Sequence, residues 1–142
     1  MILAVKINQM AYFKKQTGNY GEDLATDFLQ KKGYKILERN LTNHLGEIDI
    51  LCEGPCKTRS VLAVFQKPNR AIVVVEVKTK SGKDFGEGFE MVNSFKRSKL
   101  LFLAKSLQTK YPDRTIRIDV VSINTDSQPP EIKHFENAVE EN

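Results

Sequence analysis

The sequence predicts an α/β fold, because helical and strand-like patterns of apolar residues alternate along one chain of 142 residues. The strongest strand pattern covers residues 72–77, where five of six side chains are β-branched and apolar. Helical spacing recurs over residues 20–32 and about 91–110, and polar–apolar alternation marks residues 46–51 and 115–123. Since no internal repeat or low-complexity linker interrupts them, these elements are expected to form one domain.

Composition restricts the class of protein further. With 40% hydrophobic and 28% charged residues, the chain is typical of a soluble globular protein. A net charge of +4, from 22 basic and 18 acidic residues, fits a nucleic-acid partner without requiring one. Residues 1–5 are apolar but end at Lys6, too early for a signal peptide or a membrane span, and no later apolar stretch is longer. We therefore expect a cytoplasmic protein that does not enter the membrane.

The first helix is expected over residues 20–32, followed by Gly33 where a left-handed C-terminal cap belongs. Its apolar arc consists of Leu24, Ala25, Phe28 and Leu29. Residues 1–16 show no clear period and are expected to be an N-terminal extension of uncertain order. The domain itself is expected to span residues 17–139, and residues 140–142 to fray.

Glu22 lies in the first turn of this helix, seven residues before Leu29 and almost directly below it on the helix surface. Its carboxylate is therefore expected on the core side rather than in bulk water. Acids in first turns commonly stabilise the helix dipole by about 0.3–1 kcal/mol. On position alone, this dipole role is the stronger interpretation.

Residues 34–41 and 47–51 are expected to pair as a hairpin. In the second of these strands, Ile48 and Ile50 lie on one side and Asp49 on the other, which predicts a strand with one buried face. Asp49 thus falls within a strand rather than in a turn, and its carboxylate is a candidate functional group.

The segment 52–70 is rich in residues that interrupt regular structure. These are Gly54, Pro55, Pro68 and Asn69. Residues 61–65 are apolar enough for a short strand, and two alternatives stay open: a hairpin arm or an ordered excursion. Cys52 and Cys56 are expected in a loop here as free thiols of a reducing compartment. A zinc site needs about four ligands, and only His44 is close in sequence.

Glu76 and Lys78 share one face of the strand that begins at residue 72, because side chains alternate along a strand. One interpretation is an ion pair where the strand leaves the core. If this strand pairs with that of Asp49, however, two carboxylates fall on one face. At about 5 Å they would repel by roughly 3 kcal/mol at an effective dielectric constant of about 20. Lys78 offsets only part of this, so either one acid is protonated or a divalent cation such as Mg²⁺ completes the site.

The glycine-containing segment 81–88 follows this strand and is expected to be a mobile connection that contacts a substrate. The next helix begins with Lys96, Arg97 and Lys99. Such a cluster usually forms a solvated face, but beside a carboxylate site it would bind phosphates.

Leu101 and Phe102 lie off the main apolar stripe of that helix, which consists of Leu100, Leu103, Ala104, Leu107 and Tyr111. They either widen its core face or form a dimer contact. The last long strand carries Arg117 and Asp119 on its polar face, and residues 132–135 are expected to form a short final strand.

The order helix, three strands, helix, strand, with Asp49 on the second strand and Glu76-x-Lys78 on the next long one, resembles the PD-(D/E)XK nuclease superfamily. More narrowly, the chain is similar to the YraN-like family of small bacterial proteins that resemble Holliday-junction resolvases. Six short segments carry the similarity, in order: 21–25, 33–40, 46–50, 75–80, 117–121 and 134–138. The resemblance implies a restriction-endonuclease-like αβββαβ core, in which helices flank a mixed central sheet.

The resemblance also implies roles for individual residues. Asp49 and Glu76 would bind Mg²⁺ or Mn²⁺, and Lys78 would be the motif lysine. Glu22 would be the additional helix-borne acid of the resolvase-like branch, a catalytic and metal-site residue, which reverses the preference for a dipole role. These four residues form the expected catalytic set.

Lys96 falls where the family tends to place a basic residue on the second helix. Together with Lys80, Arg97 and Lys99, it is expected to contact nucleic acid, most favourably DNA. The implied activity is metal-dependent hydrolysis of phosphodiester bonds in structured or branched DNA. Two alternatives stay open: a non-catalytic nucleic-acid-binding module on the same scaffold, and an interaction protein that forms a homodimer.

Overall fold

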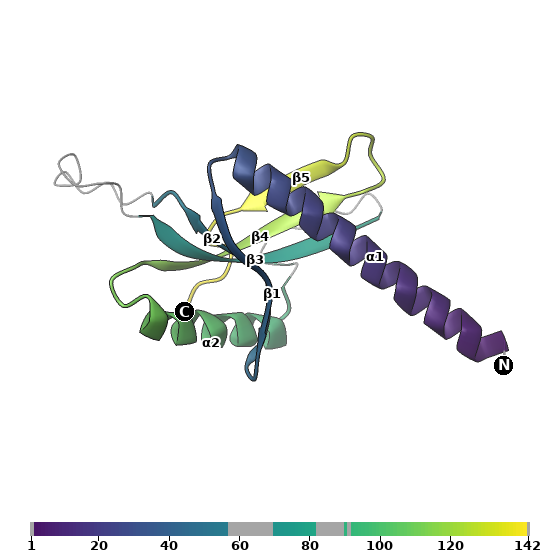
Figure 1. Ribbon diagram of the computed structural model, residues 1–142, viewed down its shortest axis with the longest axis horizontal. Coiled ribbons are helices and arrows are strands. Elements are labelled where there is room, and N and C mark those ends of the chain that lie inside the picture. Colours follow the sequence, from purple (N-terminus) through teal and green to yellow (C-terminus); the bar gives the residue numbers. More distant parts are fainter. Residues whose placement is uncertain (1, 57–69, 82–89, 91, 142) are drawn as a thin grey trace.

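The computed structural model describes residues 2–56, 70–81, 90 and 92–141, which form a five-stranded sheet and two helices (Figure 1). The elements, in chain order, are α1 (Ile2–Lys31), β1 (Lys35–Asn43), β2 (Gly46–Gly54), β3 (Ala71–Lys80), α2 (Ser94–Lys110), β4 (Ile116–Asn124) and β5 (Glu131–Phe135). The predicted α/β class and αβββαβ order are confirmed, with the short β5 at the edge. Neither of these helices combines the length and the apolar character needed to cross a lipid bilayer.

β3 is the central strand, since the strands are arranged in the order β1-β2-β3-β4-β5. β2 runs antiparallel to both β1 and β3, β3 and β4 run parallel, and β5 is antiparallel to β4. Parallel neighbours need a long crossover connection, and α2 lies in that connection between β3 and β4. Residues 71–76 of β3 are all buried, as expected for its β-branched run.

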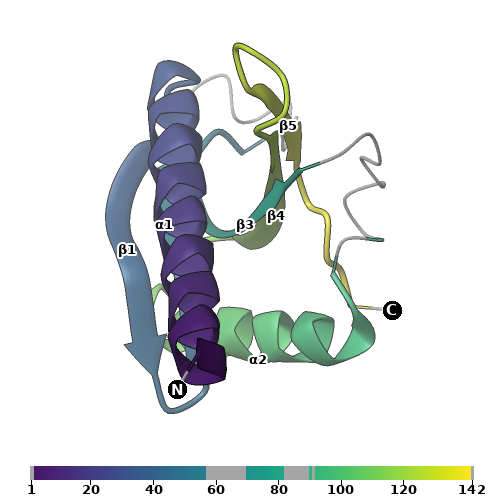
Figure 2. The same cartoon turned by 90° about the vertical axis from the view of Figure 1, so that its right-hand side faces the viewer.

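The sheet separates two layers of core, with α1 on one face and α2 on the other (Figure 1). The axes of the two helices cross rather than run side by side (Figure 2). On the α1 side, Ala25 and Leu29 pack against Ile50, Val73, Val75 and Val121, among others. On the α2 side, Leu100 and Leu103 pack against Ile72, Val74, Ile118 and Val120. Since alternate residues of β3 face alternate layers, Glu76 belongs to the α2 side with Ile72 and Val74.

Helix α1 begins at Ile2, whereas its predicted start was near Tyr20. Residues 2–16, which showed no helical period, form its first turns, and these project beyond the sheet (Figure 1). The period reports packing against a core rather than helicity itself, so it marks only the part that covers the strands. The predicted end is confirmed: Gly33 has a φ of +85°, and Tyr34 N donates to Leu29 O at 3.0 Å.

Strand β2 differs from its prediction, because both of its faces are buried. Ile48 and Leu51 join the α2-side core, and Ile50 and Cys52 join the α1-side core. β2 lies inside the sheet, between β1 and β3, so both helices cover it. The expected loop position of Cys52 was therefore wrong. Burial raises the pKa of this thiol to about 12, and among the described residues neither Cys52 nor Cys56 forms a disulfide.

Helix α2 begins at Ser94 rather than near residue 91, because Asn93 caps it with a side-chain oxygen 2.9 Å from Lys96 N. Leu101 is half-buried against the core, whereas Phe102 is 59% exposed. The strand expected at residues 61–65 and nearly all of the connection expected at residues 81–88 lie outside the described residues.

Candidate active site

The structure brings Asp49 and Glu76 together at neighbouring positions of β2 and β3. The last paired residues of these strands are Ile50 and Val75, so the next position on each strand carries one of the two acids. Beyond this last pair, a side chain rather than the backbone of β2 contacts β3: Asp49 Oδ2 accepts a hydrogen bond from Val77 N at 2.8 Å. The pairing of these two strands, on which the meeting of the two carboxylates depended, is therefore present.

Burial and charge both act on Asp49. Burial is the larger cause, and the neighbouring Glu76 charge the second, of a pKa raised to about 7. Glu22 raises this pKa further, while the Val77 N–H and the Lys96 ammonium lower it. The crowding of negative charge expected from the sequence thus exists, and the Asp49 carboxyl group titrates near neutral pH.

Glu76 is almost completely buried, with 5% of its side chain exposed, and two ammonium groups lie beside it. Lys78 Nζ is 3.1 Å from Oε1, and Lys96 Nζ is 3.2 Å from Oε2. The Lys96 contact is an ion pair by distance only, because Oε2 has no hydrogen bond of acceptable geometry. A strand lysine, Lys78, and a helix lysine, Lys96, therefore balance one carboxylate.

Gly21 allows α1 to approach β3 next to the candidate site. A Cβ atom at Gly21 would lie 2.0 Å from Thr79 Oγ1, so any side chain there forces the two elements apart or Thr79 to move. The adjacent Glu22 is 14% exposed, and its Oε2 is buried without a hydrogen-bond partner. Arg39 Nη2 lies 3.9 Å from this oxygen and forms its short contact, 2.7 Å, with Asp23. Glu22 is thus close enough to affect the pKa of Asp49 but is not hydrogen-bonded at the site.

The donor set fits a hydrated divalent cation better than an ion enclosed by protein. In the part of the chain that the structure describes, no three Asp, Glu, His or Cys side chains lie close enough to bind one ion. Mg²⁺ commonly binds through one or two carboxylates and keeps waters and substrate phosphates as its other ligands. Asp49 and Glu76 match that pattern, and an added positive charge would relieve the repulsion that raises the pKa of Asp49. Glu22 is placed outside this pair.

The remaining predicted nucleic-acid contacts have different surroundings. Lys80 belongs to the same face of β3 as Glu76, by alternation. Lys99 lies on α2 with Nζ 5.0 Å from the centre of the Phe95 ring. Arg97 Nη2 donates to the carbonyl oxygen of Glu140 at 2.8 Å and thereby contacts the C-terminal segment.

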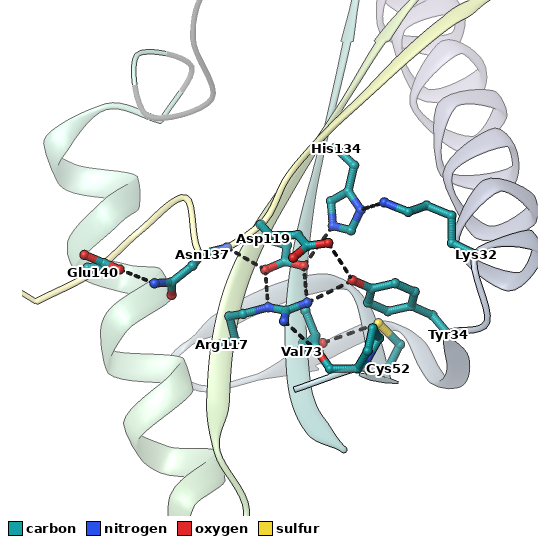
Figure 3. A network of polar contacts seen from close by, with 11 residues as sticks. Lys32, Tyr34, Cys52, Val73, Arg117, Asp119, His134, Asn137 and Glu140 are labelled. Carbon is teal, nitrogen blue, oxygen red and sulfur yellow. Dashed lines mark hydrogen bonds and ion pairs between the residues drawn. The ribbon is translucent and has the colours of Figure 1, made fainter. Parts of the chain in front are cut away.

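A second polar cluster surrounds Asp119 on β4 (Figure 3). Its side chain is fully buried and accepts hydrogen bonds from Arg117 Nε at 2.8 Å, His134 Nε2 at 2.8 Å and Asn137 N at 2.9 Å. Burial by itself would raise the pKa of Asp119, but these donors, His134 and Arg117 foremost, hold it below its usual value. The Arg117 guanidinium continues the network to the Tyr34 hydroxyl at 2.9 Å.

Lys32 fixes the tautomer of His134. The lysine ammonium can only donate, and it lies 2.8 Å from His134 Nδ1, so the ring proton is on Nε2 and points to Asp119. The Asp119 cluster therefore ties the end of α1 to β4 and β5 (Figure 3). It belongs to the opposite face of the sheet from Glu76, because Glu76 pairs with Val120 and not with Asp119. With Asp119 and His134 at most 2% exposed, its role is structural.

Partial signals for this cluster were visible in the sequence. Arg117 and Asp119 were placed together on one face of their strand, and both lie in segments that carry the family resemblance, as does His134. Alternation alone could not show that Tyr34 and the end of α1 cover this face.

Comparisons with known proteins identify the family of this chain. The model of "Uncharacterised protein family UPF0102" matches residues 21–123, which include Glu22, Asp49, Glu76 and Lys78. A UPF0102 protein of Flavobacterium psychrophilum is 38% identical over 125 residues, covering 85% of this chain and 91% of the relative. One of Geobacter metallireducens is 37% identical over 136 residues, covering 92% and 98%. The chain therefore belongs to the UPF0102 family, also called the YraN family.

Proposed function

We propose that this protein is a metal-dependent endonuclease that hydrolyses phosphodiester bonds in DNA. The observation that carries the proposal is the pair of carboxylates from β2 and β3, close enough that burial and mutual repulsion raise the pKa of Asp49 to about 7. Residues with strongly shifted pKa values concentrate at functional sites. The additional presence of two lysines at one of these acids favours a site for a charged substrate.

In the proposed mechanism, Asp49 and Glu76, together with the backbone carbonyl of Val77, would hold the cation. When bound, Mg²⁺ or Mn²⁺ supplies a water of lowered pKa and stabilises negative charge on the phosphate. The Lys78 ammonium, now paired with Glu76, turns to the phosphate oxygens and orients the attacking water. Glu22 contributes as an outer acid, since its carboxylate acts on Asp49 from beyond the pair.

The proposed substrate is structured or branched DNA. The chain carries a net charge of +4, Lys96 lies beside Glu76, and Lys80 follows on the same face of β3. These two lysines would meet the phosphates on either side of the cleaved bond. The similarity of the family to Holliday-junction resolvases supports branched over linear duplex DNA.

A panel of labelled linear, flapped and four-way DNA, incubated with Mg²⁺, Mn²⁺ or EDTA, tests the proposal. We expect cleavage products only with a divalent cation and most from a branched substrate. Glu76→Gln is expected to remove the activity, whereas Glu38→Gln, at an exposed acid on β1, keeps it. Salt-sensitive binding with no product under any condition would instead favour the non-catalytic nucleic-acid-binding module.

A further inference from the structure

A groove lies between the tip of the β1–β2 hairpin and the start of α2. Its volume is about 360 Å³, within the range of small-ligand sites. The hairpin contributes Thr42, Asn43, Gly46 and Glu47, and the helix contributes Phe95, Lys96, Lys99, Leu100 and Leu103. The floor of the groove is therefore apolar, and two lysines against one acid make its rim positive.

Phe95 is the unusual residue of this groove. It is 71% exposed, the highest value among the large hydrophobic side chains that the structure describes. Lys99 Nζ lies 5.0 Å from the centre of its ring, which places a cation beside an aromatic surface. Exposed aromatic rings next to basic side chains are the parts from which proteins build stacking sites for single-stranded nucleic acid.

Lys96 connects the groove to the candidate active site. It lines the groove, and its ammonium lies 3.2 Å from Glu76 Oε2. A ligand that fills the groove therefore contacts Lys96, the same side chain that pairs with Glu76 of the candidate active site.

We propose that this groove binds an unpaired nucleobase, which stacks on Phe95 while Lys96 and Lys99 contact the adjoining phosphates. A nucleotide combines a flat apolar ring with a negative charge, and the groove combines an exposed ring with positive charge. The inference rests on the proposed function and narrows its substrate: the cleaved strand has at least one unstacked nucleotide next to the scissile phosphate, as at a flap or a junction.

Fluorescence anisotropy in EDTA tests this without requiring cleavage. The probes are a labelled oligodeoxythymidylate and a labelled duplex of the same length. Stacking of a base on an aromatic side chain strengthens the affinity for single strands. Phe95→Ala is therefore expected to weaken binding of the single strand by about 5- to 100-fold and of the duplex by about 2-fold or less. Phe95→Trp is expected to restore single-strand binding. Phe102→Ala is the matched control, an exposed phenylalanine on the same helix that does not line the groove, and is expected to bind like wild type.

Separate readouts distinguish failure of this inference from failure of the proposed function. If Phe95→Ala binds and cleaves every substrate like wild type, the base site is refuted while the nuclease proposal stands. If wild type cleaves nothing but loses single-strand binding on Phe95→Ala, the base site stands without the nuclease. Phe95, Lys99 and Phe102 also share one helix face, so sedimentation of both alanine variants is included. Self-association that Phe95→Ala abolishes, with no change in oligonucleotide binding, would assign the surface to a second copy and overturn the inference.

Discussion

At the scale of single residues, Asp49 lowers the stability of the folded protein when its carboxyl group is ionised. Its pKa in the folded protein is about 7, above the 3.8 of an unperturbed aspartate. Between these values the folded state retains a proton that the unfolded state has lost, so stability falls as pH rises. This destabilisation is absent below about pH 4 and fully present above pH 7. Such costs are common where a side chain is retained for chemistry rather than for stability.

Asp49→Asn is therefore expected to stabilise the protein at pH 8, by about 1–3 kcal/mol after allowance for the partial solvent exposure of the group. The amide oxygen can still accept the hydrogen bond from Val77 N, so the change removes mainly charge. Urea unfolding of both proteins at pH 8 and at pH 4 measures the effect, which is expected to vanish at the lower pH. An equal gain at both pH values would show that the charge of Asp49 is not its cause.

Asp119 is expected to behave in the opposite way, because its folded-state pKa is lowered. Asp119 contributes its full share of folding stability above about pH 3.8, the ordinary pKa of an aspartate. That contribution is lost as the pH falls through the lowered pKa of the folded state. Asp119→Ala leaves the largely buried Arg117 guanidinium without its carboxylate partner and is expected to cost about 3–5 kcal/mol at pH 7. Urea unfolding at pH 7 measures this cost.

Asp113→Ala is the control for that experiment, at an exposed acid before the same strand, and is expected to change stability by less than about 0.5 kcal/mol. The difference between wild type and Asp119→Ala is expected to narrow in acid. A difference that persists unchanged at pH 2 would contradict the role assigned to the Asp119 carboxylate.

Residue identity predicted the acid pair but not the buried cluster. Glu76 was recognised because it interrupts an apolar strand, and Asp49 because it falls within a strand rather than in a turn. Whether the two acids meet depended on a pairing of their strands that the sequence left open and that the structure contains. Asp119 lies in an equally ordinary alternating strand. Its burial depends on Tyr34 and His134, which are far from it in sequence and which no local period connects to it.

At the scale of elements, the packing of α1 on β3 decides where Glu22 lies. Glycine within a helix normally costs about 1 kcal/mol relative to alanine, so its presence at position 21 needs a structural reason. The contact with Thr79 supplies that reason, since a Cβ atom there meets the threonine hydroxyl at 2.0 Å.

Gly21→Ala is accordingly expected to destabilise the protein by about 1–3 kcal/mol through overpacking. Gly18→Ala on the same helix, where a Cβ meets nothing within 4 Å, is expected to stabilise it by about 0.5–1 kcal/mol. Thermal unfolding of both variants compares them. Addition of Thr79→Ala is expected to recover most of the loss in Gly21→Ala, and failure of that rescue would place the strain elsewhere.

Element boundaries could be predicted where a local signal exists. Gly33 marked the end of α1, and β3 was recognisable from its β-branched run. The first turns of α1 could not be recognised, because they project beyond the sheet and need no apolar face matched to it (Figure 1). The two-sided burial of β2 was also missed, because it depends on strand order and on both helices rather than on the strand's own alternation.

At the scale of the whole molecule, the net charge of +4 is modest, so binding of DNA depends on where the basic side chains lie. In the proposed function, the lysines of β3 and of early α2 contact phosphates, and binding to DNA releases counterions. Lys80→Gln is expected to reduce the slope of log affinity against log salt by about 0.7–0.9. Anisotropy titrations across a salt series measure it.

Lys105→Gln is the matched control for the salt series. Lys105 pairs with Glu141 of the C-terminal segment on another part of α2, so its replacement is expected to leave the slope unchanged. Equal changes in slope for both variants would mean that charge acts through the net total rather than through a defined surface.

The order of elements and the family were available from the sequence because six short segments occur in the expected order, and the family model covers most of the same region. What the sequence could not supply is the mutual placement of those segments. The grouping of Phe95 with the hairpin tip and of Lys96 with Glu76 depends on how α2 lies across the sheet.

The central claim is that the carboxylates of β2 and β3 support metal-dependent phosphodiester hydrolysis. Its most direct test is the single-turnover rate on a labelled four-way junction with Mn²⁺, measured for wild type and for Glu76→Gln with thermal unfolding in parallel. We predict that wild type cleaves and that Glu76→Gln, although folded, falls to the rate seen with EDTA. Cleavage by the folded variant at the wild-type rate would contradict the claim.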